Sequence, residues 1–547
     1  MYPNSTTAFV DGLRAILDFG EVIDVRGREV KEVRARIYQI ASPAQRTYVL
    51  PHRNNSVFGT IAETIWVLAG RNDIGYLSRY LSRASKFSDD GATWRAGYGP
   101  RLRAWSGIDQ IAEVRRLLLA DPASRRAVVG LFDPAVDFQE SKDVPCNNWL
   151  QFMIRDGKLD MLATIRSNDA VWGFSGINTF EWSVLQEMVA HWTGTEVGTF
   201  TYFIGSFHLY KHHYSRARRI VNAFGGRTPY DFEVPTLTFG TPFDRLDLTL
   251  RRWFEIEQAM REGRETSDQI ADFPDPFLRG CLGMLRIYNR HLDGAPSNEL
   301  AELILQMPES DFRVAAAEYF LRDDETFPLD RMSAREQEFF SYFVADHEKD
   351  MAAIRPLLAL LSVLHDKKTR VYQDAWKKRG ETLGIIANIA RKYDRLDVAA
   401  TGGAFHKLAD EGQMDTLADL ATYAAKYLTF LADTDPVGTI AFMARYRPTE
   451  PIDRYQGNYG FDDVGEVLAL RYDQDRTLKA IQTQAECFLR VQEAYAIVER
   501  LAREGGATET KCEVIADLAL SALHYMMLLA LEAPGPSAAF KSSIERL

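Results

Sequence analysis

The chain has 547 residues, of which 46% are apolar and 26% charged, the ordinary composition of a globular protein. At roughly 150 residues per domain, this length predicts two to four domains with several buried cores. The formal net charge of −11 disfavours nonspecific binding to nucleic acid. A local basic pocket for one small anion remains compatible with that charge.

The four cysteines, Cys146, Cys281, Cys487 and Cys512, are scattered and form no CxxC pair. This spacing argues against a disulfide framework or a zinc site and fits a reducing cytosol. The N-terminus lacks the basic and apolar regions of a secretory signal. No uninterrupted apolar run approaches the roughly 20 residues that span a bilayer. We therefore expect a cytoplasmic protein that has neither membrane nor nucleic acid as a partner.

The first 260 residues combine helical patterns with short β-rich runs that are bounded by Gly, Asp or Pro. A segment rich in Gly and Pro near their end, residues 225–245, is typical of a loop or an edge strand. In chain order, the expected elements are a helix over 56–70, strands over 125–132, 149–154 and 158–165, a helix over 177–194 and a strand over 199–205.

Helical patterns dominate the chain after about residue 248, with few β-like runs. We expect a helical connector over residues 261–345 and an all-helical domain over residues 346–547. The predicted fold is therefore an α+β domain over residues 1–260, followed by the connector and an all-α C-terminal domain.

A possible nucleophile, Cys146, lies in the segment VPCNNWLQF, just before a β-like run. A thiol becomes a strong nucleophile when nearby positive charge lowers its pKa. Arg125 and Arg126 open one β-like run, and Arg166 lies in the segment IRSND, one β-like segment after the cysteine. Guanidinium groups bind phosphate through charge-assisted hydrogen bonds, so this set suggests covalent attack on a phosphorylated substrate. In the alternative, the thiol is structural and the arginines pair with surface carboxylates.

An ordered series of short motifs runs from Cys146 to His213: PC, QF, DGKL, RSxD, Gly, Asn, EVG, HLY and His. Three segments precede it in register, namely AETIWVLAG, YGPRLRAW followed by IDQI, and DPASRR. In order and spacing, this series resembles the core of the thymidylate synthase and pyrimidine nucleotide hydroxymethylase family. The resemblance covers about residues 10–215 and implies a thymidylate synthase-like α+β fold for the N-terminal domain.

The resemblance implies four catalytic residues. Cys146 would attack C6 of a pyrimidine nucleotide and make C5 nucleophilic, so that C5 can take up a one-carbon unit from 5,10-methylenetetrahydrofolate. Glu63 would organise water and proton transfer at the base. Tyr98 would assist removal of the C5 proton. Asp169 would contact the folate and the water network.

The same resemblance implies a phosphate site shared between two subunits. Arg166 and Ser167 would hold the 5′-phosphate from one subunit. Arg125 and Arg126 would reach in from the neighbouring subunit, because members of the family are obligate homodimers.

Further binding residues follow from the resemblance. Arg26 matches the family's mobile-loop arginine, with Arg28 as a rival for that position. Asn178 would read the pyrimidine edge, because an amide can donate and accept at once. His208 and Tyr210 would bind the sugar hydroxyl.

Three departures from the family pattern bear on the reaction. Asn147 follows the cysteine where the family usually has His, and the segment from Gly173 to Asn178 carries one additional residue and no Pro. The C-terminal tail that closes over the folate in the synthases is not recognisable. Because closure excludes water, these departures favour water capture, and hence hydroxymethylation of CMP, dCMP or dUMP.

Three alternatives to hydroxymethylation stay open. One is reductive methylation of dUMP, as in a thymidylate synthase; Asn178 is the residue typical of uracil recognition, but an amide can also serve cytosine. A second is a non-catalytic regulator that binds nucleotide, and a third is a scaffold. Both are disfavoured because Cys146, Tyr98, Arg166 and Asp169 occur together.

The segment 362–432 faintly resembles helical domains of nucleotide modification that are related to all-α nucleotide pyrophosphohydrolases, in which helical carboxylates hold Mg²⁺ on a triphosphate. An ordinary solvated helix face is the favoured alternative. The candidate metal ligands are Asp415 and Asp419, with Glu411 nearby and Glu513 and Asp517 as a second pair; the candidate phosphate contacts are Lys392 and Arg395.

Overall fold

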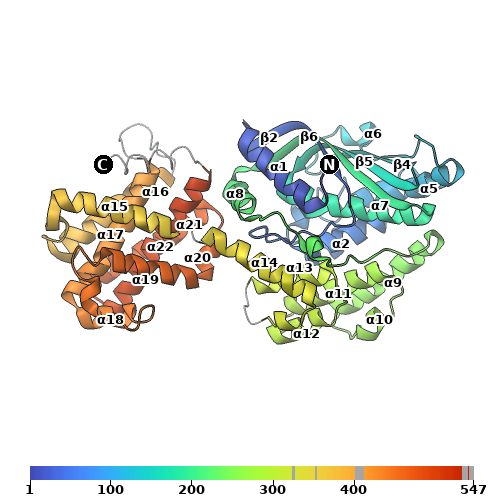
Figure 1. Cartoon of the computed structure of the whole chain (residues 1–547). Helices are drawn as coiled ribbons and strands as arrows, with labels where there is room; N and C mark the ends of the chain where they lie inside the picture. The colour runs from blue at the N-terminus through green and yellow to red at the C-terminus, as the bar shows by residue number, and fades with distance from the viewer. Residues whose placement is uncertain (323–326, 352–353, 401–411, 533–539, 541–547) are drawn as a thin grey trace. The chain divides into compact units, whose positions relative to one another are not determined.

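The computed structural model describes residues 1–322, 327–351, 354–400, 412–532 and 540. The chain divides into two compact units (Figure 1). The first consists of Met1–Lys211 and Ile220–Asp346, and the second of His212–Arg219 and His347–Leu547. The first unit combines helices with a six-stranded sheet, and the described part of the second unit contains helices only, which confirms the predicted fold class.

The sheet of the first unit is mixed. Its strands, in spatial order, are β1 (Glu21–Asp24), β2 (Glu29–Ile40), β6 (Glu196–Tyr210), β5 (Lys158–Asp169), β4 (Asn147–Arg155) and β3 (Val128–Gly130). The β5–β6 pair is parallel and the other neighbouring pairs are antiparallel. The chain therefore crosses over between β5 and β6, and helix α7 (Thr179–Thr193) makes that connection.

One face of the sheet is covered by helices. Alternate residues of β5, namely Met161, Ala163 and Ile165, are buried, as expected for a strand with one face towards the core. Helix α1 (Ser5–Phe19) packs against β2 and β6, and α7 packs against β5 and β6 (Figure 1). Helix α2 (Val57–Leu68) packs against α7 in turn.

The opposite face carries exposed apolar side chains. Ile37 on β2 is 56% exposed, and Phe203, its register partner on β6, is 37% exposed. Val128 on β3 is also exposed. Large apolar side chains gathered on one face of a sheet are typical of a surface that another molecule covers.

The other helices of the first unit surround this core, and residues 261–345 belong to it. They are α3 (Ile74–Tyr80), α4 (Tyr98–Arg103), α5 (Gln110–Ala120), α6 (Pro134–Asp137), α9 (Leu246–Arg261), α10 (Ser267–Ala271), α11 (Pro276–Leu292), α12 (Ser297–Leu305), α13 (Asp311–Leu321) and α14 (Ala334–Met351). The boundary between the two units falls inside two helices: α14 continues past Asp346, and α8 (Tyr214–Ala223) begins in the segment 212–219 of the second unit and ends in the first. The segment 225–245 is loop with short 3₁₀ turns at Pro229–Phe232 and Phe243–Arg245.

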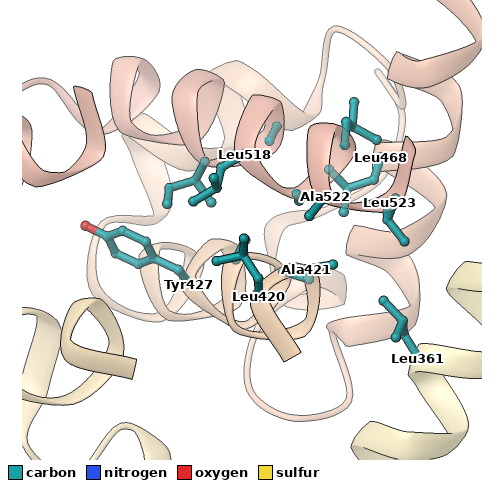
Figure 2. Packing of buried hydrophobic residues seen from close by; sticks show 14 of the residues in the cluster. Leu361, Leu420, Ala421, Tyr427, Leu468, Leu518, Ala522 and Leu523 are labelled. Carbon is teal, nitrogen blue, oxygen red and sulfur yellow. The ribbon is translucent and has the colours of Figure 1, made fainter. Parts of the chain in front are cut away.

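The second unit is built around two long helices, α17 (Gln413–Thr434) and α22 (Thr508–Glu532). Figure 2 shows Leu420 and Ala421 of α17 facing Leu518 and Ala522 of α22. The surrounding helices are α15 (Ile354–Tyr372), α16 (Ala387–Ala400), α18 (Pro436–Met443), α19 (Phe461–Gln474), α20 (Arg476–Ala480) and α21 (Gln484–Glu504).

Helix α22 is long and apolar enough to cross a membrane by length and composition, over Thr508–Leu531. However, 72% of its most apolar window is buried inside the second unit. A helix that is apolar all round and buried is typical of a core.

Candidate active site

Cys146 lies directly before β4, next to Arg166 on the neighbouring strand β5. The Arg166 amide donates to the Cys146 carbonyl over 2.9 Å, and Arg166 Nη2 lies 3.7 Å from Cys146 Sγ. The guanidinium also donates to the carbonyl oxygens of Pro145 and Val144, over 2.9 Å each. These backbone contacts hold the arginine at the thiol.

Three effects act on the Cys146 thiol. Burial raises its pKa, the charge of Arg166 lowers it and the charge of Asp143 raises it, so that the pKa lies above its usual value. Arg166 therefore offsets only part of the cost of forming a thiolate at this position. Further positive charge at the site would favour the thiolate.

Tyr98, the first residue of α4, is tied to the residue after the cysteine. The fully buried Asn147 donates to Tyr98 Oη through its backbone N–H (3.1 Å) and through Nδ2 (2.7 Å). Asn147 Oδ1 accepts from Trp182 Nε1 over 3.0 Å. A phenol has two acceptor lone pairs, so Tyr98 keeps its hydroxyl hydrogen to donate. Burial, and then the charge of Cys146, raises the pKa of Tyr98, which stays neutral.

Three carboxyl groups are linked electrostatically, beginning at the thiol: Asp143 acts on Cys146 and on Glu63, and Glu63 acts on Glu181. Burial and the charge of Asp143 raise the pKa of Glu63, on α2, to about 8. Burial and the charge of Glu63 raise the pKa of Glu181, on α7, well above its usual value. Within the described residues, Glu63 Oε2 and both carboxyl oxygens of Glu181 have no hydrogen-bond partner. Sequence reasoning missed Glu181 and Asp143; the available signal was a glutamate inside an apolar helical run.

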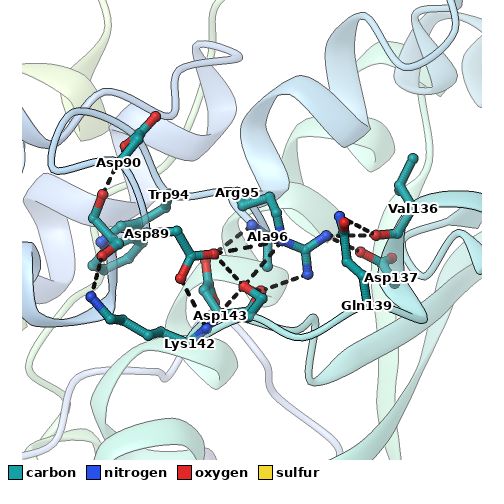
Figure 3. Close-up of polar contacts among 12 residues, drawn as sticks. Asp89, Asp90, Trp94, Arg95, Ala96, Val136, Asp137, Gln139, Lys142 and Asp143 are labelled. Carbon is teal, nitrogen blue, oxygen red and sulfur yellow. Dashed lines mark hydrogen bonds and ion pairs between the residues drawn. The ribbon is translucent and has the colours of Figure 1, made fainter.

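The loop that leads to Cys146 is fixed by ionic contacts, which Figure 3 shows. The Arg95 guanidinium donates to the carbonyl oxygens of Val136 (2.7 Å) and Asp143 (3.0 Å). The Ala96 amide donates to the Asp143 carboxylate over 3.0 Å. Lys142 donates through its amide to Asp89 over 3.0 Å. These contacts hold the loop that precedes Cys146, so the position of the cysteine is fixed before strand β4 begins.

The additional residue between Gly173 and Asn178 lies in a π-helix, Ala170–Asn178, that leads directly into α7. A π-helix holds more residues per turn than an α-helix, so it accommodates an insertion without breaking the helix. Asp169 begins it by accepting from the amides of Val171 (2.7 Å) and Trp172 (2.9 Å).

Gly173 brings two amide side chains together inside this turn. A Cβ at position 173 would lie 2.2 Å from Asn168 Oδ1 and 3.0 Å from Asn178 Oδ1. Only glycine allows that approach. Asn168 is buried, and neither its Oδ1 nor its Nδ2 has a partner within the described residues.

The parallel pair β5–β6 brings the remaining strand residues together. Ser167 pairs in register with Ser206, and Asp169 with His208. The His208 and Tyr210 rings lie 5.5 Å apart, in an edge-to-face arrangement. The structure thus gathers Arg166, Ser167, Asp169, His208 and Tyr210 at neighbouring strand ends.

Arg26 lies elsewhere, at the exposed tip of the β1–β2 hairpin. Val25 and Arg28 exchange backbone hydrogen bonds of 2.9 and 3.2 Å around Arg26 and Gly27. Both central residues have positive φ, 55° and 75°, which matches the twist of a two-residue hairpin. Three strands separate β1 from β4 in the sheet.

Arg125 and Arg126 are exposed just before β3. Val128 pairs with Gln151, so the continued antiparallel register places Arg126 level with Met153, seven residues along β4 from Cys146. At about 3.3 Å per residue, the separation is roughly 20 Å. Within the described residues, neither arginine side chain makes an ion pair.

Three of the candidate carboxylates of the second unit, Asp419, Glu513 and Asp517, form ion pairs. Asp419 pairs with Lys368 (2.8 Å) and Lys392 (2.6 Å), and Asp415 accepts from the Gly412 amide (3.1 Å). Glu513 pairs with Arg445 and Arg471, Asp517 pairs with Arg471, Arg395 is exposed, and Glu411 lies outside the described residues. Among the described residues, no group of three or more His, Cys, Asp or Glu could hold a metal ion.

The mixed sheet thus holds a cysteine beside an arginine, with a tyrosine tied to the residue after the cysteine. Residues 7–258 match the thymidylate synthase family. The chain is 30% identical, over 352 residues, to a deoxyuridylate hydroxymethyltransferase of Bacillus phage SP01. The aligned region covers 58% of this chain and 92% of that relative. The chain belongs to the thymidylate synthase family.

Two further relatives carry the same name. A deoxyuridylate hydroxymethyltransferase of Pseudomonas phage M6 is 37% identical over 171 residues, 31% of this chain and 49% of the relative. One from Delftia phage PhiW-14 is 35% identical over 186 residues, 32% of this chain and 51% of the relative. The chain thus spans about half the length of each of these two relatives.

Proposed function

We propose that this protein transfers a one-carbon unit from 5,10-methylenetetrahydrofolate to C5 of dUMP and completes the reaction with water, giving 5-hydroxymethyl-dUMP and tetrahydrofolate. The observation that carries the proposal is the Cys146–Arg166 pair, 3.7 Å apart, in a chain similar over most of a deoxyuridylate hydroxymethyltransferase. The names of the relatives favour dUMP over CMP and dCMP, and the amide of Asn178 suits O4 and N3–H of uracil.

The first step is addition of Cys146 Sγ to C6 of the pyrimidine, which makes C5 nucleophilic. The Arg166 charge stabilises the thiolate before attack, and the 5′-phosphate would lie against the same guanidinium. Tyr98, aligned by Asn147, donates its hydroxyl hydrogen to a water that removes the C5 proton.

The second step decides the product. After the folate nitrogen leaves, the base carries an exocyclic methylene at C5. Hydride transfer from the folate would give a methyl group, whereas water gives a hydroxymethyl group. Glu63 and Glu181 offer buried carboxyl oxygens without a hydrogen-bond partner among the described residues, which suits a bound water and favours hydration.

We also propose that the active site forms in a homodimer. Arg126 lies roughly 20 Å from Cys146 along the sheet, too far to share a nucleotide phosphate with Arg166 of the same chain. The exposed sheet face with Ile37, Phe203 and Val128 offers an apolar surface for a second copy. In that arrangement, Arg125 and Arg126 would serve the partner's site.

The test is incubation with methylenetetrahydrofolate and, separately, dUMP, UMP, dCMP and CMP, with Cys146→Ser as control. Product mass and dihydrofolate absorbance are followed together. We expect dUMP to gain CH₂O without dihydrofolate. A gain of CH₂ with stoichiometric dihydrofolate would establish reductive methylation instead, and no product from any nucleotide would favour a regulator.

A further inference from the structure

Glu181 is a fully buried acid without a structural partner. It lies in the first turn of α7, its residue is 0% exposed, and both carboxyl oxygens lack a hydrogen-bond partner in the part of the chain that the structure describes. Burying a carboxyl group without hydrogen bonds costs several kcal/mol, on the order of the stability of a small domain. An apolar side chain of similar size would avoid that cost.

The other buried acid of the same helix behaves differently. Glu187 forms an ion pair with Arg46 and accepts from the Phe239 amide over 2.8 Å. That carboxylate therefore ties helix α7 to two other segments of the fold. Glu181 makes no such tie, so the packing of the helix does not account for its carboxyl group.

The surroundings of Glu181 belong to the thiol site. The next residue, Trp182, donates to Asn147, and Asn147 donates to the Tyr98 hydroxyl. The Trp182 and Tyr98 rings lie 5.3 Å apart. Glu63 faces the group from helix α2, which packs directly on α7.

The site needs an acceptor for one particular proton. When water adds to the exocyclic methylene, the water must lose a proton as its oxygen bonds to carbon. Tyr98 is a neutral phenol whose lone pairs are occupied by Asn147, so it is a poor acceptor. The charge of Glu63 raises the pKa of the buried Glu181 carboxyl, so Glu63 is the first of the two to become anionic and is the available acceptor.

We propose that Glu181 is a second catalytic carboxyl, and that Glu63 and Glu181 together hold the attacking water and accept its proton. This inference rests on the proposed hydroxymethylation and names the residues that perform its last chemical step. Glu63 alone would leave the partnerless acid of α7 unexplained.

The water oxygen forms a bond to the methylene carbon, and one O–H bond of that water breaks, its proton passing to the carboxyl pair. The electrons of the exocyclic double bond move to the C5–C4–O4 enolate. The enolate then restores the C5–C6 double bond and expels the Cys146 thiolate, with no net oxidation or reduction.

The experiment compares wild type, Glu181→Gln and Glu181→Met in four readouts. These are the covalent complex with 5-fluoro-dUMP and methylenetetrahydrofolate, tritium release from C5 of labelled dUMP, formation of 5-hydroxymethyl-dUMP, and the thermal unfolding midpoint. Added 2-mercaptoethanol captures any methylene intermediate as a thioether. Glu187→Gln is the matched control, because it removes a buried acid from the same helix.

We expect both Glu181 variants to form the covalent complex and to release tritium within a few-fold of wild type. Hydroxymethyl product should fall on the order of 100-fold, and the thioether should accumulate. The unfolding midpoint should stay or rise, because a desolvated acid is removed. Glu187→Gln should lower the midpoint but keep product and tritium release in their wild-type ratio.

Three results would overturn the inference: undiminished hydroxymethyl product, an equal fall of tritium release and product, or failure of both variants to fold. The last would show that the carboxyl group belongs to the fold. If wild type itself makes no hydroxymethyl product, the proposed function fails. If wild type makes it and Glu181→Gln makes it equally well, only the role of Glu181 fails.

Discussion

Asn147 follows Cys146 and connects two side chains of the site. Its side chain contacts Tyr98 and Trp182, so it aligns the phenol that we propose acts at the C5 side of the base. The family usually has a histidine at this position. The chain therefore uses a different group to hold the same tyrosine.

Asn147→Ala should slow removal of the C5 proton by about tenfold or more, because Tyr98 loses its side-chain donor while the backbone contact remains. Covalent capture of 5-fluoro-dUMP by Cys146 should persist. Tritium release and mass spectrometry of the complex measure the two effects. Asn148→Ala, one residue along the strand, is the control; equal loss in both variants would argue against alignment of Tyr98.

Glu63 couples the site to pH. Its pKa in the folded protein is raised from 4.5 to about 8, so the folded state holds a proton that the unfolded state releases. The resulting stability is fully present below about pH 4.5 and is lost as pH rises through about 8. We expect the thermal midpoint of Glu63→Gln to decline less between pH 5 and 8 than that of wild type; parallel curves would contradict the shift.

The π-helix Ala170–Asn178 sets the position of Asn178, the amide that we propose reads the base. Gly173→Ala would force its Cβ against Asn168 and Asn178, so the turn must shift. We expect weaker nucleotide binding, measured as a raised KM for the pyrimidine nucleotide. Gly75→Ala is the matched control, because that helical glycine has open space around its Cα and an ordinary φ. An unchanged KM in Gly173→Ala would show that the amide cluster does not touch the base.

Helix α17 of the second unit depends on Asp419. Burial raises the pKa of this carboxyl, but Lys368 and Lys392 outweigh burial and hold it below its usual value. Asp419→Asn would remove the carboxylate that pairs with Lys368 and with the nearly buried Lys392, and we expect the free energy of unfolding of this unit to fall by about 3 kcal/mol. Urea unfolding followed by circular dichroism measures it, with exposed Glu493→Gln as control. If added Mg²⁺ stabilised the wild type and the variant lost that stabilisation, a metal site would be favoured instead.

Local motifs singled out Cys146 and Arg166, which the structure brings together. Cys146 directly precedes strand β4 and Arg166 lies on strand β5. The two residues come together because β4 and β5 pair in the sheet. Glu181 could not be predicted, since one acid in an apolar run is equally compatible with an exposed position. The π-helix was also hidden, because one extra residue in sequence is indistinguishable from a longer loop. The expected strand over 125–132 is only Val128–Gly130, because it pairs on one side alone.

The whole molecule combines a unit of the thymidylate synthase family with a second, helical unit that has its own hydrophobic core. If two copies share the phosphate site, Arg126→Ala and Cys146→Ser should each be inactive as purified homodimers. Mixing and re-association should restore part of the activity, because one site in the hybrid combines intact Cys146 with intact Arg126 of the partner. Size-exclusion chromatography with light scattering confirms the mass. An active Arg126→Ala protein, or no recovery in the hybrid, would contradict a shared site.

The central claim, that water completes the reaction, is tested most directly by turnover of dUMP and methylenetetrahydrofolate in ¹⁸O-labelled water. Mass spectrometry of the nucleotide and absorbance of dihydrofolate are recorded on the same sample. We expect 5-hydroxymethyl-dUMP with one ¹⁸O atom in the hydroxymethyl group and no dihydrofolate. A methylated nucleotide without label, formed together with an equal amount of dihydrofolate, would contradict it.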